Sequence, residues 1–330
     1  MVELDKSKYT MEYTVVIRTL GTAGEKYQAL LDSIAKQTIQ PKEVIVVIPH
    51  GYDLPKEQLG YERFVRSKKG MVAQRVVGAA EVKTDYCLFA DDDVCFEENF
   101  ISRIFEPIAK CKASVTFPIF KEMLPMGLSV RMAMLLIGSA IPFERKQSFT
   151  SITRSGGYSY NPSSTFKGYY KAESAPGTCF FCSRDAMLAI HFEEELWLEN
   201  TAYPIPEDQV MFYKFCKLGY KIIGVSDLNF IHLDAGGNSP GRFLKVAYAM
   251  ACNKTIFWHR FIWATDSNIL SKLLSLLCFL YCATASFLYD CTKALLSKNF
   301  DLVKSVLKGY KQAIGFIKSD EYKQIPRIKK

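Results

Sequence analysis

The strongest constraint on the fold of this 330-residue chain is a strand–helix–strand pattern within its first fifty residues. Residues 13–19 are rich in β-branched side chains and predict a strand, and residues 26–37 place Leu30, Leu31 and Ile34 on one face of a helix. Residues 43–48 are apolar almost throughout, as expected of a parallel strand that is covered on both faces. We therefore predict a right-handed βαβ unit and, for the chain, an α/β fold with a mostly parallel sheet flanked by helices.

Three consecutive carboxylates, Asp91, Asp92 and Asp93, follow an apolar run at residues 86–90 that predicts a buried strand. They fall where that strand leaves the sheet, and ligands of open α/β sheets bind at the carboxyl ends of strands. No Lys or Arg follows directly, so a divalent cation would relieve their mutual repulsion. Carboxylate oxygens are ligands of Mg²⁺ or Mn²⁺, which usually bind substrate phosphates as well. A solvated acidic turn that caps the next helix is the alternative.

The alternation of strands and helices continues beyond this motif. Residues 155–167 are rich in Gly, Ser, Tyr, Asn and Pro and predict a long loop over a site. Cys179 and Cys182 form a CxxC pair without a second pair, and the ten scattered cysteines favour reduced thiols in the core. We expect further strands at about 64–65, 114–118, 178–182 and 221–225, and helices at about 71–82, 97–109, 184–190 and 206–218.

The order and spacing of these segments resemble the family 2 glycosyltransferases, which are inverting enzymes of the GT-A fold that use a nucleotide-diphosphate sugar. The resemblance covers residues 13–263 and implies a GT-A catalytic domain at residues 1–255. It depends on the segment from Ser33 to Val47, the Asp-x-Asp motif at residues 91–93, Gly177, the acidic pair Glu207 and Asp208, and His232.

The resemblance also implies roles for individual residues. Asp93 and His232 would bind the Mg²⁺ or Mn²⁺ that bridges the two donor phosphates, and Arg75 would lie near the diphosphate. The alternatives are a hydrogen-bonded histidine at a strand end and an arginine on a helix surface. The family usually has an acidic residue directly after the second strand; this chain lacks it, and Asp53 is the substitute. The donor side then holds Arg18, Thr19, Asp53, Arg75, Asp91 and Asp92, and the acceptor side holds Gly177 and Glu207.

Asp208 is the expected general base. A single in-line displacement with inversion needs one carboxylate to take the proton of the acceptor hydroxyl. Asp208 falls in the first turn of a predicted helix, whose dipole favours an anion at that end. The alternative is that Glu207 and Asp208 only cap this helix.

Residues 256–330 predict a helical, membrane-associating tail. Residues 273–289 carry no charge, and this length is the lower limit for a transmembrane helix, so a buried or interfacial helix is the alternative. Apolar residues then recur at helical spacing from Leu296 to Ile317, with lysines on the opposite face, which suits an anionic lipid surface. Packing on the catalytic domain or on a second subunit is the alternative for this helix.

The net charge of +8 is concentrated in the tail, where residues 290–330 hold ten Lys or Arg and four Asp or Glu. This favours an anionic membrane surface over nucleic acid as a partner. The polar first eight residues do not resemble a signal peptide, so we expect the cytoplasmic face of the membrane.

Together these observations predict a Mg²⁺- or Mn²⁺-dependent, inverting transfer of a sugar from a nucleotide-sugar donor to a glycan or lipid-linked acceptor. By resemblance, the product is a bacterial surface polysaccharide. A non-catalytic nucleotide-binding scaffold and a sugar-phosphate nucleotidyltransferase are the alternatives, and homo-oligomerisation is left open.

Overall fold

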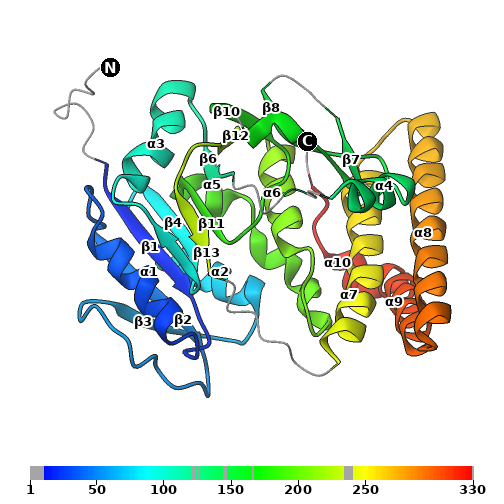
Figure 1. Ribbon diagram of the computed structural model, residues 1–330, viewed down its shortest axis with the longest axis horizontal. Helices are drawn as coiled ribbons and strands as arrows, with labels where there is room; N and C mark the ends of the chain where they lie inside the picture. Colours follow the sequence, from blue (N-terminus) through cyan, green and yellow to red (C-terminus); the bar gives the residue numbers. More distant parts are fainter. Residues whose placement is uncertain are drawn as a thin grey trace.

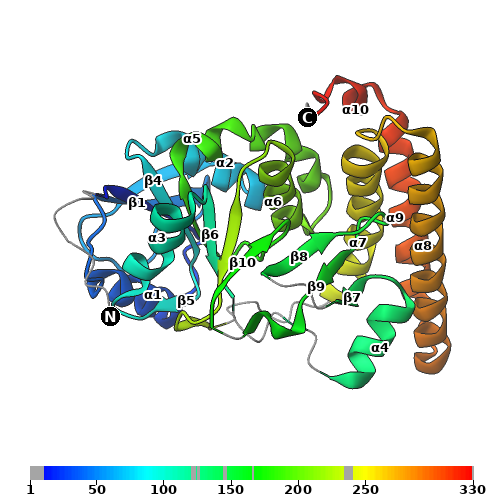
Figure 2. The same cartoon turned by 90° about the horizontal axis from the view of Figure 1, so that it is seen from above.

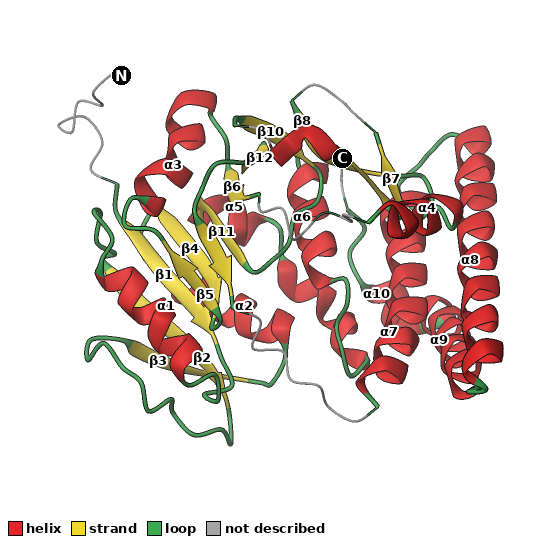
Figure 3. Ribbon diagram, in the orientation of Figure 1, coloured by secondary structure: helices red, strands yellow, loops and turns green. Residues whose placement is uncertain are grey.

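The computed structural model describes residues 11–119, 124, 127–143, 147–165, 167–233 and 241–328. Most strands of this described part belong to one large sheet, which helices cover on both faces (Figures 1 and 3). These strands are β1 (Tyr13–Arg18), β2 (Glu43–Pro49), β3 (Arg63–Ser67), β4 (Tyr86–Asp91), β6 (Val115–Pro118), β7 (Ala140–Pro142), β8 (Ser148–Ile152), β9 (Tyr158–Tyr160), β10 (Tyr169–Ala172), β11 (Cys179–Ser183) and β12 (Ile222–Val225).

The sheet is mixed, with the order β3-β2-β1-β4-β11-β6-β12-β10-β8-β9-β7. Its first four strands are parallel, and β11 then enters antiparallel to both β4 and β6. The expected α/β fold and the strand–helix–strand unit at its start are confirmed, because β1 and β2 pair in parallel around the first helix.

The helices are α1 (Glu25–Ala35), α2 (Met71–Glu81), α3 (Phe100–Cys111), α4 (Leu128–Leu136), α5 (Arg184–Ala189), α6 (Glu207–Lys217), α7 (Arg242–Phe257), α8 (Ile269–Ser297), α9 (Asp301–Lys318) and α10 (Asp320–Gln324). Two segments are 3₁₀-helical, η2 (Pro162–Thr165) and η3 (Phe192–Asn200), and one is π-helical, η4 (Trp258–Trp263).

The strands bury both of their faces, because each face has its own hydrophobic core. Val15 and Ile17 of β1 pack with α1 and α3, whereas Val16 of the same strand packs with α2, α5 and α6. Such two-sided burial explains why the parallel strands are apolar without alternation. It fixes the strand ends, where β1 and β4 stop side by side with Arg18 opposite Asp91.

A separate two-stranded sheet lies beyond the acidic motif. In it β5 (Val94–Phe96) pairs antiparallel with β13 (Phe230–His232), and His232 stands opposite Val94. This pairing brings two segments that are far apart in the sequence to the same place. It leaves His232 beside Asp93, the residue before β5.

The prediction of a long loop at residues 155–167 is wrong for part of this segment. Residues 158–160 form β9, which pairs with β7 and β8, and η2 follows, while residue 166 lies outside the described residues. Tyr158 and Tyr160 have high β-propensity, and two neighbouring strands offer backbone partners. These tertiary pairings outweigh the loop composition of the flanking residues.

Helices α7, α8 and α9 lie together at the end of the molecule away from β1 (Figures 1 and 2). On α9, a Cβ added at Gly309 would overlap the Tyr248 carbonyl oxygen of α7. The buried face of α9 therefore includes a small residue where the two helices come closest, beside larger apolar residues. It consists of Leu302, Val306, Gly309, Ala313 and Phe316.

Helix α9 thus has a buried face and a second apolar face that is more exposed. The apolar stripe predicted between Leu296 and Ile317 is a different face, and its members Leu307 and Ile314 remain about half exposed, at 51% and 52%. The alternative of packing on the rest of the chain is thus correct for one face, and of the predicted stripe Tyr310 and Ile317 are also partly buried against the hydrophobic cores. The boundary expected at residue 255 lies inside α7.

Helix α8 is the only helix in the described ranges that is long and apolar enough to cross a membrane. It extends the segment predicted at residues 273–289 in both directions. Near its middle it is attached to the rest of the molecule: the Tyr281 hydroxyl donates to the Leu136 carbonyl at 2.5 Å, and the Phe279 ring stacks on Trp258 at 4.2 Å between centroids. Its outer side exposes leucines such as Leu277, which is 64% exposed.

A buried ion network connects η3 and α6 to η4, which follows α7. Glu195 of η3 is fully buried and accepts hydrogen bonds from Lys214 of α6 at 2.8 Å and from Arg260 of η4 at 2.7 Å. Trp197 donates to the same carboxylate at 2.6 Å. Although burial opposes its charge, the two cations lower the pKa of Glu195. Through these hydrogen bonds, the buried carboxylate fixes the positions of η3, α6 and η4 relative to one another.

Candidate active site

The carboxyl ends of β1 and β4 open into a cavity of about 590 Å³. Its walls come from the two strand ends, from the start of α2 and from the segment after η3. Five residues predicted for the donor or the metal line it, namely Arg18, Thr19, Asp91, Asp92 and Asp93.

Two of the three aspartates of the motif are engaged by the neighbouring strand. Arg18 donates to both carboxylate oxygens of Asp91, at 2.5 and 2.8 Å, and Thr19 donates to Asp92 at 2.6 Å. Burial, together with the charges of Asp91 and Asp93, raises the pKa of Asp92 to about 6. At the cavity, Asp91 is therefore charge-paired, and Asp92 is still mostly ionised near physiological pH but takes up a proton more readily than an ordinary aspartate.

Asp93 and His232 form the remaining pair of potential ligands. Asp93 Oδ2 lies 3.3 Å from His232 Nε2. Within the residues that the structure describes, no cluster of three or more His, Cys, Asp or Glu side chains forms a metal cage. A carboxylate and an imidazole nonetheless suit Mn²⁺ or Mg²⁺, because these ions are usually held by one or two side chains and by substrate phosphates.

Arg75 is buried behind the cavity, at 2% exposure, so the alternative of a surface arginine is wrong. It donates to Glu207 at 3.1 Å and to the Gly177 carbonyl at 2.6 Å, and it lies 3.9 Å from Asp91. Burial and the nearby Arg18 lower its pKa. Arg75 thus joins Asp91, which was predicted for the donor side, to Gly177 and Glu207, which were predicted for the acceptor side.

Asp208 faces a different cavity, of about 350 Å³, on the other side of this arginine. Burial and the neighbouring Glu207 carboxylate raise the pKa of Asp208 to about 7. The Gln209 backbone N–H donates to its Oδ1 at 2.7 Å, and the Gly177 N–H also hydrogen bonds to it. A carboxyl group with this pKa can take up a proton near neutral pH. Its contact with Gln209 also fits the capping alternative.

Asp53 does not join these residues. Its side chain is exposed, and it is absent from the described lining of the donor-side cavity. Its backbone carbonyl lies against Gly21, where an added Cβ would approach within 2.5 Å. The structure therefore brings together the predicted residues from β1, β4, α2 and α6, and it leaves Asp53 on the neighbouring loop.

Several residues of the two cavities could not be found from the sequence alone. Glu199 lines the donor-side cavity and accepts the backbone N–H groups of Val72 and Ala73 at 2.8 and 2.9 Å, so it caps α2. Tyr158 and Lys254 line the cavity of Asp208. Lys254 lies in a basic, aromatic stretch at residues 253–263, whose composition does not by itself place the residue at a cavity.

The sequence of residues 14–187, more than half of the chain, matches the family model described as glycosyl transferase family 2. No curated protein matches the chain. Among solved structures, the mannosyltransferase PcManGT from Pyrobaculum calidifontis, in complex with GDP-Man and Mn²⁺, is similar with a TM-score of 0.51. It is 11% identical, and the match covers 93% of this chain and 88% of that one. The expected fold is thereby confirmed.

Two further solved structures are similar at lower TM-scores. S. aureus TarS residues 1–349 is 17% identical with a TM-score of 0.42, and the match covers 92% of each chain. GalNAc-T7 with UDP, GalNAc and Mn²⁺ is 15% identical with a TM-score of 0.46, over 86% of this chain. The chain spans 57% of the GalNAc-T7 chain.

Proposed function

Because this chain belongs to glycosyl transferase family 2 and is a glycosyltransferase, we propose that it transfers a sugar with inversion from a nucleotide-diphosphate donor to a glycan or lipid-linked acceptor. The observation that carries the proposal is the pair of cavities on the two sides of Arg75. One holds the acidic motif, and the other holds a carboxyl group with a pKa of about 7.

The cavity of the acidic motif is the proposed donor site. Its volume of about 590 Å³ is typical of small-molecule sites, and it lies at the strand ends where α/β sheets bind nucleotides. Lys69, Arg18 and the more deeply buried Arg75 supply positive charge near it. The Pyrobaculum mannosyltransferase is described with GDP-Man, and we extend a donor of this nucleotide-sugar class to the present chain.

Asp93 and His232 are the proposed ligands of Mn²⁺ or Mg²⁺. Such an ion, when bound, offsets negative charge on the diphosphate that leaves. Asp93 is buried to 8% exposure at the start of β5, so the sheet pairing of β5 with β13 holds its position relative to His232. Arg18 keeps Asp91 in place beside it through two hydrogen bonds.

Asp208 is the proposed general base. The acceptor hydroxyl loses its proton to a carboxylate oxygen of Asp208 while its oxygen forms a bond to the anomeric carbon. The bond from that carbon to the donor phosphate breaks, and the nucleoside diphosphate carries away the electron pair. Arg75 and Gly177 fix the position of Asp208 and Glu207 relative to the donor side. A pKa of about 7 is suited to proton uptake at this step.

We also propose that the enzyme works at a membrane surface, with α8 lying in the interface. The contacts of α8 with Trp258 and Leu136 hold it against the catalytic part, so spanning a bilayer would require it to detach. The exposed leucines of its outer side, and the basic tail, are features of an interfacial helix. The cytoplasmic face and a surface polysaccharide product are part of this proposal.

Calorimetric titration with UDP, GDP and dTDP, each with and without Mn²⁺, tests the donor site. We expect one nucleotide to bind only with the metal, and we expect the Asp93→Asn variant to lose this binding. Asp185→Asn is the matched control, because Asp185 is an exposed carboxylate on α5, with its side chain 96% exposed. Equal metal-dependent binding by the Asp93→Asn variant would show that the metal is held elsewhere.

A further inference from the structure

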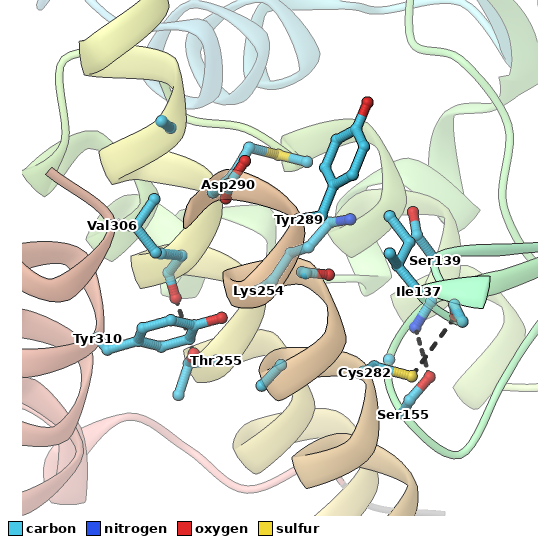
Figure 4. A pocket seen from close by; sticks show the side chains of 18 of the residues that line it. Ile137, Ser139, Ser155, Lys254, Thr255, Cys282, Tyr289, Asp290, Val306 and Tyr310 are labelled. Carbon is cyan, nitrogen blue, oxygen red and sulfur yellow. Dashed lines mark hydrogen bonds between the residues drawn. The ribbon is translucent and has the colours of Figure 1, made fainter. Parts of the chain in front are cut away.

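A third cavity, of about 300 Å³, lies between α7, α8 and α9 and the turn that precedes β7 (Figure 4). Most of its wall is apolar, with Phe243, Ala247, Phe279, Ala283 and Val306 among the lining residues. It adjoins the cavity of Asp208, because Met250 and Lys254 of α7 line both. The apolar cavity is thus next to the proposed acceptor site, and the cation at their boundary is Lys254.

Lys254 is the notable residue at this junction. It is partly buried, and none of the described residues forms a hydrogen bond or an ion pair with its ammonium group. Burial lowers its pKa, and the thiol of Cys282 opposes this shift to a smaller extent. The other charged lining residue is Asp290, whose neighbouring cation is Lys293. Figure 4 shows the Lys254 side chain reaching from α7 into the cavity.

We propose that the two adjoining cavities bind one acceptor, a phosphate or diphosphate ester of a long apolar alcohol that carries the receiving sugar. Lys254 binds the phosphate, the cavity between α7, α8 and α9 holds the first part of the apolar chain, and the sugar hydroxyl reaches Asp208. This inference rests on the proposed function and names the class of its acceptor. A cation that pairs with none of the described residues, between an apolar space and a carboxyl group, matches the three parts of such a molecule.

The surroundings of the cavity supply the route for the apolar chain. Helix α8 forms one wall and exposes Leu277 and Leu280 on its outer side. Helix α4 lies next to it, joined through the hydrogen bond from Tyr281 to Leu136, and exposes Leu128 and Leu136 at 78% and 62%. The cavity therefore adjoins the surface that we propose to face the membrane, from which a lipid-linked acceptor would enter.

Binding of farnesyl phosphate to the full chain tests this proposal, with farnesol and inorganic phosphate as the other two probes. Trp258 stacks on the lining residue Phe279, so its fluorescence reports occupancy, and calorimetry gives the affinity. We expect farnesyl phosphate to bind at least about tenfold more tightly than either farnesol or phosphate, because only it uses both the apolar wall and the cation.

The Lys254→Gln variant should bind farnesyl phosphate at least about tenfold more weakly, while its affinity for farnesol stays the same. Lys245→Gln is the matched control, since Lys245 is an exposed lysine on the same helix and lines neither cavity. Ala247→Trp, which fills the apolar cavity, should weaken both farnesyl probes. Melting temperatures of all variants confirm that they fold.

Two results would overturn the inference: equal affinity for farnesyl phosphate and farnesol, or equal affinity of the Lys254→Gln and Lys245→Gln variants for farnesyl phosphate. Absence of any binding by the unaltered protein would do the same. Nucleotide binding is measured on the same preparations. If the unaltered protein binds farnesyl phosphate but no nucleotide, the proposed donor site is wrong and the lipid phosphate site stands.

Discussion

The pKa of Asp208 leads to a prediction about the pH dependence of the reaction. A base must be ionised to accept the acceptor proton, so kcat/KM should increase with pH through the pKa of the free enzyme. For a group with a pKa of about 7, the ionised fraction rises from roughly a tenth at pH 6 to roughly nine tenths at pH 8. We therefore expect an increase of about tenfold over this interval.

The same shift has a consequence for stability, with the opposite sign. A carboxyl group whose folded pKa exceeds its unfolded value stabilises the protein below the unfolded pKa, and this contribution is lost as the pH rises through the folded value. Each pKa unit corresponds to about 1.4 kcal/mol, so a shift from 3.8 to about 7 sets an upper bound of about 4 kcal/mol. The actual amount is smaller, because the side chain is open to a cavity.

Two variants separate the base from a merely structural carboxyl group. Asp208→Asn should lose transfer, keep nucleotide binding, and melt at a higher temperature than the parent at pH 8 but not at pH 4. Glu207→Gln removes a charge that raises the pKa of Asp208, so the limb of its kcat/KM profile should move to lower pH. Initial rates of sugar transfer at saturating metal provide the profile. A limb near pH 4 in the parent, or unchanged transfer by the Asp208→Asn variant, would refute the assignment.

Other expected outcomes concern packing, the ion network and the surface. Gly309→Ala should destabilise the protein, because the new Cβ meets the Tyr248 carbonyl, whereas Gly315→Ala on the same helix has open space and should stabilise it by about 0.5–1 kcal/mol; urea titrations compare the two. Glu195→Gln removes the buried negative charge that Lys214 and Arg260 share, leaves them only the carboxylate of Glu194, and should cost up to about 3–5 kcal/mol, while Glu193→Gln at an exposed site should change little in the same assay. Gly177→Ala would place a Cβ 2.5 Å from Arg75 Nη2, so it should displace this guanidinium group and lower kcat. A kcat near that of the parent would show that the position of Arg75 is unimportant. Leu277→Ser should reduce co-sedimentation with anionic vesicles and Leu54→Ser, also at an exposed leucine, should not.

The strand ends of this site could be predicted because local sequence determines them. Residues 44–49 and 86–90 are continuous apolar runs of the length typical of buried strands, and the polar residues that follow them then lie at the edge of the sheet. The helix that carries Arg75 was also predictable from its pattern. Its burial was not, because a buried arginine depends on partners such as Glu207 that are 132 residues away.

Other features depend on contacts that no local pattern reveals. The packed face of α9 uses Gly309 and Ala313, and small residues give a weak hydrophobic signal even where they allow the closest approach of two helices. Strand β9 forms only because β7 and β8 flank it. Lys254 could be noticed as part of a basic, aromatic segment, but its place between two cavities follows from how α7 packs on its neighbours.

Arg75 lies 3.9 Å from Asp91, which lines one cavity, and donates to Glu207, the neighbour of the Asp208 that lines the other. A change of net charge on the donor side alters the potential at Arg75, and through Glu207 it alters the energy of ionising Asp208. The affinities for donor and acceptor are then thermodynamically linked, and each substrate changes the affinity of the other by the same factor. One guanidinium group would thus be enough to couple the two proposed substrate sites electrostatically.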